Sequence, residues 1–172
     1  IVDDSHGFGV TGEDGAGVFA QLKARLQPNV RLVVASSMGK ALGIPAGVVL
    51  GDKALVDRLR HSHYFGGASP AIPAFLYAFL KCEPVFREAR QKLFANISYF
   101  LGHLERPGQF SYFEGYPVFG VHEHQLAAYL QEHGVIISSF RYPTPADDPI
   151  TRVILSSAHQ EEDIQRLTGL IN

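Results

Sequence analysis

The sequence has a single cysteine, Cys82, among its 172 residues. One cysteine excludes a disulfide framework within the chain and fits a reducing compartment, so we expect a cytoplasmic protein. No apolar run reaches the roughly 20 residues that a membrane-spanning helix needs. No stretch concentrates lysine and arginine, and the net charge is −2. The composition therefore indicates neither nucleic acid nor an anionic membrane as a partner.

What the composition does contain is ordinary for a globular protein. Hydrophobic residues make up 46% of the chain and charged residues 19%. A chain of this length can bury a real core, either as one domain or as a large and a small lobe. No internal repeat or low-complexity segment interrupts it.

The beginning of the chain is unusual. It has no initiator methionine and opens with Ile1-Val2, which resembles the end of a buried strand, followed at once by the polar Asp3 and Asp4. Because natural domains rarely begin in the middle of a strand, we expect the chain to be the C-terminal part of a longer protein.

Strands and helices are expected to alternate, which predicts an α/β fold. Short apolar runs indicate strands, and apolar residues at helical spacing indicate helices. The expected strands are 1–2, 32–35, 47–51, 117–121, 135–140 and 152–155, and the expected helices are 18–26, 53–61, 74–104 with an interruption near Pro84, 122–132 and 160–171. Residues 64–73 are expected to be a loop, and aromatic residues between 75 and 100 to be core. The change of pattern near Pro107-Gly108 predicts two domains, 1–107 and 108–172.

Three groups of residues could carry chemistry. Asp3-x-x-His6 ends the first strand, Ser37-x-x-Lys40 follows the second, and Arg152 lies on a late strand. In α/β sheets, ligands collect outside the carboxyl ends of the strands, where the first two groups would both lie.

A carboxylate, an imidazole and a lysine at one sheet edge are the parts needed to hold pyridoxal phosphate. A carboxylate keeps the proton on the ring nitrogen, and the cofactor draws electrons most strongly in that state. A lysine amine bonds to the cofactor and can then remove the substrate's α-proton. An imidazole can bond the phenolic oxygen, and an arginine fork suits a substrate carboxylate.

Other interpretations of the same residues exist. Asp3-x-x-His6 could be a capping or loop cluster, and Ser37-x-x-Lys40 could belong to a serine nucleophile, although the partner motifs of that chemistry are absent. His122-x-His124 could bind a metal ion, but no partner ligand has matching spacing, so we expect no metal site and favour a solvated helix start.

The motifs together resemble one family. The glycine-rich run from Val2 to Gly17, the segment from Ser36 to Gly43 and the segment from Thr151 to Ile164 are similar, in order and spacing, to the α-oxoamine synthases. These are pyridoxal-phosphate enzymes of fold type I. The resemblance covers the whole chain and implies the end of the mainly parallel sheet of the large domain, followed by a small α/β C-terminal lobe.

The resemblance also implies a role for each residue. Asp3 would pair with the pyridine nitrogen and His6 with the phenolic oxygen. Lys40 would be the Schiff-base lysine, Ser37 would bond the cofactor phosphate, and Arg152 would bind the substrate carboxylate. Asp4, the neighbour of the first aspartate, receives no catalytic role.

The implied activity is condensation of an amino acid with an acyl-CoA, usually with loss of carbon dioxide, in a homodimeric biosynthetic enzyme. We expect the present chain to be inactive alone, because the family's N-terminal half is missing. An aminotransferase of the same fold, which would need no CoA, is one alternative. A non-catalytic dimerisation or regulatory module is another.

The chain departs from the family at two places. Many members have a Ser-Thr-Ser-x-Pro-Pro-like run that lends a phosphate contact to the neighbouring subunit, where this chain has Phe65-Gly66-Gly67-Ala68-Ser69-Pro70. The hydroxyl is missing at Gly66, so the contact would come from a backbone amide or Ser69, or be absent. Ile150 stands where several members carry a second arginine.

Overall fold

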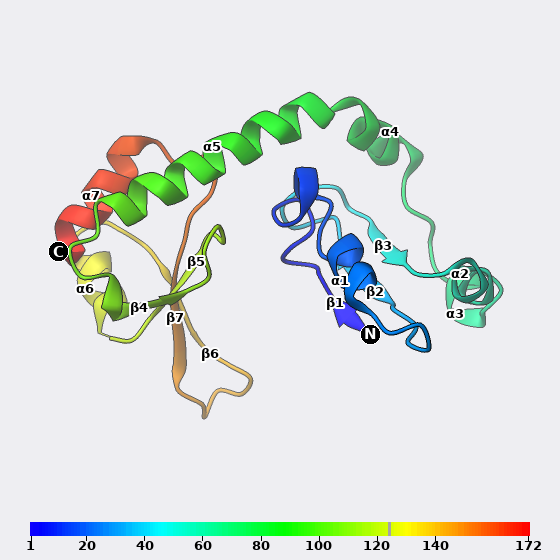
Figure 1. The fold of residues 1–172 in the computed structure, drawn as a ribbon. Helices are drawn as coiled ribbons and strands as arrows, with labels where there is room; N and C mark the ends of the chain where they lie inside the picture. The colour runs from blue at the N-terminus through cyan, green and yellow to red at the C-terminus, as the bar shows by residue number, and fades with distance from the viewer. Residues whose placement is uncertain (124) are drawn as a thin grey trace. The chain divides into compact units, whose positions relative to one another are not determined.

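The computed structural model describes residues 1–123 and 125–172 of the chain (Figure 1). The chain forms two compact units, Ile1–Arg90 and Gln91–Asn172. The helix α5 (Glu83–Gly102) contributes residues 83–90 to the first unit and 91–102 to the second. The expected α/β class is confirmed, and the domain boundary expected at residue 107 stays a prediction.

The first unit is built around a three-stranded sheet with the order β1-β2-β3. Its elements, in chain order, are β1 (Val2–Asp3), the 3-10 turn η1 (Glu13–Gly15), α1 (Phe19–Arg25), β2 (Val34–Ser37), β3 (Gly47–Leu50), α2 (Lys53–Arg60), α3 (His63–Gly66), α4 (Pro73–Lys81) and the start of α5.

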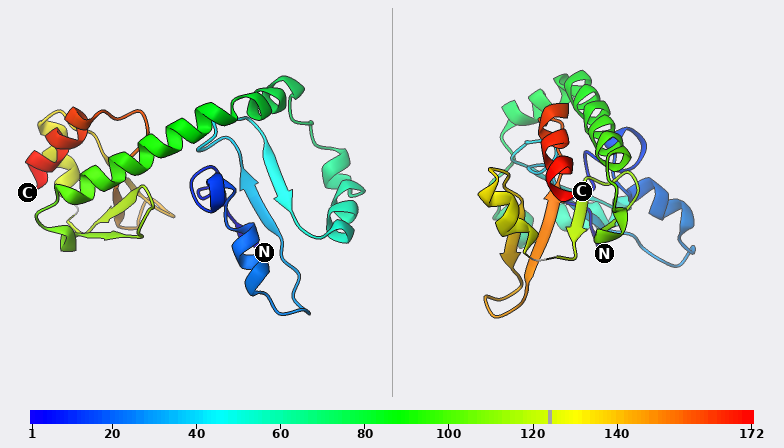
Figure 2. Two further views of the ribbon diagram at one scale, coloured as in Figure 1. Left: turned by 45° about the horizontal axis from the view of Figure 1, so that its top comes forward. Right: turned by 90° about the vertical axis from the view of Figure 1, so that its left-hand side faces the viewer.

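The strands β1 and β2 run parallel, with Val2 opposite Val34 and Asp3 opposite Ala35. Asp4 continues the pairing, because its amide donates to the carbonyl of Ala35 at 2.9 Å. The third strand, β3, is antiparallel to β2, and Figure 2 shows the two arrows pointing in opposite directions. The carboxyl ends of β1 and β2 therefore lie at the same edge of the sheet.

Local signals in the sequence explain where the helices of this unit begin. Asp52 caps α2 by accepting a hydrogen bond from the Leu55 amide at 2.8 Å. The interruption expected near Pro84 is the junction between α4 and α5, and the proline is the second residue of α5, where its missing amide costs nothing. The short helix α3 falls where a loop was expected.

The expectation of an aromatic core between residues 75 and 100 holds only in part. Phe100 is fully buried in the second unit, whereas the aromatic side chains of α4 in the first unit are exposed, Tyr77 by 63% and Phe75 by 41%. The first unit also exposes Tyr64 by 91% and Leu80 by 72%. Helical spacing shows that a helix has an apolar face, but not that the face has a partner.

The second unit carries a four-stranded antiparallel sheet with the order β4-β5-β7-β6. Its elements, after the end of α5, are the 3-10 turn η2 (Pro107–Gln109), β4 (Phe110–Tyr112), β5 (Val118–Val121), α6 (Leu126–Glu132), β6 (Ser138–Arg141), β7 (Pro149–Ile154) and α7 (Glu161–Ile171).

An aromatic cluster joins helix and sheet in this unit. The ring of Phe100 on α5 lies edge-on to Phe119 of β5 at 4.8 Å and to Phe110 of β4 at 5.9 Å. Such edge-to-face pairs add roughly 0.5–1.5 kcal/mol each to the burial itself. The cluster holds the end of α5 on the sheet.

The helices α5 and α7 run side by side in the same direction (Figures 1 and 2). Lys92, in the middle of α5, bonds Gln160 before the start of α7 at 3.3 Å, and Asn172 donates to the His103 carbonyl at 2.8 Å near the ends of the two helices. A capping box between Gln160 and Asp163 begins α7. Among the described residues, no helix is both long and apolar enough to cross a membrane.

Candidate functional site

The edge formed by the ends of β1 and β2 gathers four of the expected site residues. Asp3 is the last residue of β1, and His6 follows in the next turn. Ser37 is the last residue of β2, and Lys40 follows it three residues later. The two segments are joined by a hydrogen bond from the Ser37 amide to the Ser5 hydroxyl at 3.1 Å. The parallel pairing thus brings both motifs together.

Asp3 is an exposed carboxylate that is held in its charged form. The main cause of its lowered pKa is hydrogen bonding to the Ser5 side chain, and the second is the Ser5 amide, which donates to Oδ1 at 2.8 Å. The positive charges of Lys40 and His6 lower the pKa further, although burial opposes the shift. An ionised carboxylate at this edge is the group that a protonated pyridine nitrogen requires.

Lys40 lies in the turn that connects β2 to β3. The turn is closed at its base by a hydrogen bond from the Met38 amide to the Ala46 carbonyl at 2.9 Å. Met38 is buried with 6% exposure, whereas Lys40 two residues later is exposed. A buried side chain therefore anchors the turn, and the amine extends into solvent at the sheet edge.

Ser37 keeps its hydroxyl hydrogen available. Its Oγ accepts a hydrogen bond from the Gly39 amide at 3.2 Å, which shapes the turn before Lys40. A serine hydroxyl can accept and donate at once, so the O–H can still donate to an anionic oxygen. This arrangement fits the phosphate contact expected of Ser37.

Asp4 has a structural role that the sequence interpretation missed. It is 7% exposed, and its Oδ2 accepts a hydrogen bond from the Val18 amide at 2.9 Å. A Cβ atom at Gly7 or Gly17 would overlap this carboxylate, so glycine is required where the loop passes it.

Arg152 belongs to the second unit, at the centre of its sheet. On β7 it lies opposite Gly120 of β5 and Ser138 of β6, and its guanidinium lies 5.2 Å from the centre of the Phe140 ring. Its Nε is buried and donates to no acceptor among the described residues. Leaving such a donor unpaired costs roughly 1–3 kcal/mol. A bound carboxylate would supply the missing acceptor.

The two departures from the family can be placed in the structure. Ile150, two residues before Arg152 on β7, is 39% exposed and offers no polar contact. Gly66 ends the short helix α3, and a side chain there would meet open space. The missing hydroxyl therefore does not reflect a lack of room.

The metal-binding interpretation of the histidine pair, against which the sequence argued, is not tested by the structure. His124 lies outside the described residues, so the pair His122-x-His124 cannot be placed. Within residues 1–123 and 125–172, no three metal-ligating side chains come together.

The class of protein follows from the fold and from a match along nearly the whole chain. Residues 1–171 match the aminotransferase class I and II family. The chain belongs to this family.

The individual relatives are more specific. An 8-amino-7-oxononanoate synthase of Cupriavidus necator is 32% identical over all of this chain, and one of Serratia proteamaculans is 34% identical over all of it. The chain spans 46% of the length of each, or about half of these curated relatives. The resemblance to the α-oxoamine synthases is thereby confirmed.

Solved structures agree with this assignment. The 8-amino-7-oxononanoate synthase of Francisella tularensis superimposes with a TM-score of 0.72 at 25% identity, covering 99% of this chain and 53% of that one. Serine palmitoyltransferase of Sphingomonas wittichii gives a TM-score of 0.73 at 22% identity, covering 99% of this chain and 45% of that one. The second likeness shows the shared fold.

Proposed function

We propose that the whole protein is a pyridoxal-phosphate-dependent acyltransferase that condenses an amino acid with an acyl-CoA. The observation that carries this proposal is the common edge of β1 and β2, where Asp3, His6 and Lys40 come together. The relatives named 8-amino-7-oxononanoate synthase support the class of reaction. The usual loss of the amino acid's carboxyl group as carbon dioxide is part of the proposal.

Bound pyridoxal phosphate supplies an electron sink for the substrate's α-carbon. The carboxylate of Asp3 would hold a proton at the pyridine nitrogen, and His6 would bond the phenolic oxygen. The amine of Lys40 would hold the cofactor and would serve as the base for the substrate's α-proton. The hydroxyl of Ser37 would donate to the phosphate.

Arg152 is proposed to bind the carboxylate of the amino acid. Its unpaired, buried Nε and its planar fork suit a carboxylate better than a lysine would. The proposed domain division at residue 107 would place Arg152 in a small C-terminal domain and the other four residues in the large one.

The test is whether the whole protein releases free CoA. We expect thiol release that needs both an amino acid and an acyl-CoA, measured over a panel of each. The family also contains aminotransferases, which favours one alternative. Transfer of the amino group to a 2-oxo acid, with no need for CoA, would establish that alternative and overturn the acyltransferase.

We also propose that the whole protein is a cytoplasmic homodimer. The single cysteine, Cys82, supports a reducing compartment. Cell fractionation and light scattering of the purified protein test the two statements separately. Recovery in the membrane fraction, or a monomeric mass at working concentration, would contradict them.

A further inference from the structure

The glycine-rich loop, residues 7–17, has a fixed internal fold. Its two sides are joined by hydrogen bonds from the Gly9 amide to the Gly15 carbonyl at 2.8 Å and from the Gly17 amide to the Thr11 carbonyl at 2.9 Å. The loop follows His6 directly. Its conformation therefore determines where the chain carrying His6 leaves the sheet.

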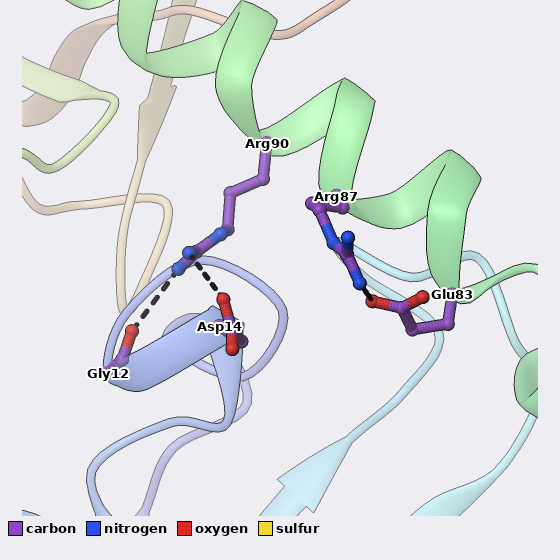
Figure 3. Close-up of polar contacts among 5 residues, drawn as sticks. All are labelled: Gly12, Asp14, Glu83, Arg87 and Arg90. Carbon is purple, nitrogen blue, oxygen red and sulfur yellow. Dashed lines mark hydrogen bonds and ion pairs between the residues drawn. The ribbon is translucent and has the colours of Figure 1, made fainter.

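Arg90 on α5 bonds the tip of this loop (Figure 3). Its guanidinium donates to the Gly12 carbonyl at 3.2 Å and lies 3.5 Å from the Asp14 carboxylate. The side chain of Arg90 is 21% exposed, whereas that of Asp14 is 85% exposed. Exposed ion pairs contribute little, so the bond to the Gly12 carbonyl is the stronger constraint.

Arg87, one helical turn earlier, provides a natural comparison. It pairs with Glu83 on its own helix, and its side chain is 60% exposed (Figure 3). Arg87 and Arg90 line the same cavity of about 370 Å³, whose apolar wall includes Phe8 and Phe86. The two arginines share a helix, a charge and a cavity. Among the described residues, Arg90 has hydrogen bonds to the loop, whereas Arg87 interacts with the loop residue Asp14 through charge and has its hydrogen bonds to Glu83.

The base of the loop is tied to the candidate site. The amides of Gly7 and Phe8 donate to the Asp4 carbonyl at 3.0 and 2.9 Å, and the Val18 amide donates to the Asp4 carboxylate. A displacement of the loop tip would therefore also move the residues on either side of Asp4.

We propose that Arg90 is a positioning residue for Asp3 and His6, acting through the glycine-rich loop. The proposal rests on the proposed function, because the two residues have a reacting partner only if the cofactor binds. Arg90 acts through the loop and not by contact with cofactor or substrate. Its contribution is to keep the loop in the one arrangement that presents the imidazole and the carboxylate together.

The first experiment measures the loop itself, by hydrogen exchange of the whole protein with mass spectrometry of peptides covering residues 7–18. Arg90→Gln should speed exchange there about tenfold, because local opening becomes easier. Arg87→Gln should leave it unchanged. Arg90→Lys keeps the charge but loses the planar guanidinium, so its exchange rate in residues 7–18 should lie between those of Arg90→Gln and the parent protein. Equal exchange in Arg90→Gln and Arg87→Gln would overturn the proposal.

The second experiment measures the consequence at the site. In Arg90→Gln, the pH titration of the bound cofactor's absorbance should shift, and kcat should fall more than KM for the amino acid rises. A merely structural role would lower the melting temperature without moving the titration of the folded enzyme, and this outcome would also overturn the proposal. Failure of the parent protein to bind pyridoxal phosphate would instead contradict the proposed function, and with it the positioning role of Arg90.

Discussion

Asp3 is the residue whose environment is best defined at the candidate site. Folding lowers its pKa, chiefly through the hydrogen bonds to Ser5. Its ionised form therefore stabilises the folded chain above the ordinary carboxyl pKa of about 3.9, and this contribution is lost as the pH falls through the lower, folded value. At neutral pH the carboxylate is fully charged.

The pH dependence can be tested by nuclear magnetic resonance of the Asp3 carboxyl carbon in the cofactor-free protein. The midpoint should lie below the ordinary value. Ser5→Ala should raise it more than Lys40→Ala does, because hydrogen bonding to Ser5 is the larger cause and the charge of Lys40 the smaller one. An unchanged midpoint in Ser5→Ala would show that this description of Asp3 is wrong.

Arg152 offers a second test at the residue scale. Arg152→Lys keeps the charge and loses the planar guanidinium. KM for the amino acid should therefore rise roughly 10- to 100-fold, which corresponds to the loss of one hydrogen bond between charged groups. The absorbance of the bound cofactor should stay the same. Arg141→Lys on the neighbouring strand is the control, because Arg141 is exposed and bonds the Asp147 carbonyl. Loss of cofactor affinity in Arg152→Lys would instead indicate a structural role.

Among the elements, the glycine-rich loop depends most on one buried group. Asp4→Ala removes the acceptor for the Val18 amide and should destabilise the protein by about 1–3 kcal/mol. Asp4→Asn keeps an acceptor oxygen and should retain most of the stability. Thermal unfolding of the cofactor-free protein measures both. Equal stability of Asp4→Ala and the parent would show that the loop does not depend on this carboxylate.

The elements also show what the sequence could and could not predict. The edge that joins Asp3 to Lys40 followed from two apolar runs, each ending in polar residues, because parallel strands share an edge. The strand β4 was not expected, since its three residues, Phe110–Tyr112, are too few for a pattern. The helix α3 was taken for a loop because Gly66 and Gly67 break the helical spacing.

The sequence also does not show which individual side chains are buried, because long-range contacts decide this. Asp4 received no role because nothing in a pair of adjacent aspartates says which of them is buried. The aromatic residues of α4 were expected in the core, but the contacts that decide burial are long-range. Arg152 was expected on a late strand and lies on β7, but its unpaired Nε could be found only from the structure.

On the scale of the whole molecule, the first unit leaves a large amount of apolar surface uncovered. Besides the side chains of α4, Phe65 and Val85 are each 60% exposed. β1 is also at one end of the described sheet, with a side that pairs with no strand. Surfaces and edges of this kind promote association.

The 172-residue chain made alone should therefore self-associate or precipitate. It should also show no transferase activity and little affinity for pyridoxal phosphate. Light scattering and absorbance of the purified chain, with the cofactor added, test these statements together. A monodisperse monomer that turned yellow and reacted with an amino acid would contradict them.

The central claim is that Lys40 is the lysine bonded to the cofactor, and it can be tested by chemical labelling. Borohydride reduction of the whole protein with bound pyridoxal phosphate, followed by digestion and mass spectrometry, identifies the modified lysine. We predict the label on the peptide containing Lys40, with loss of both label and turnover in Lys40→Ala. Label on Lys23 or Lys53, or continued turnover in Lys40→Ala, would contradict the account.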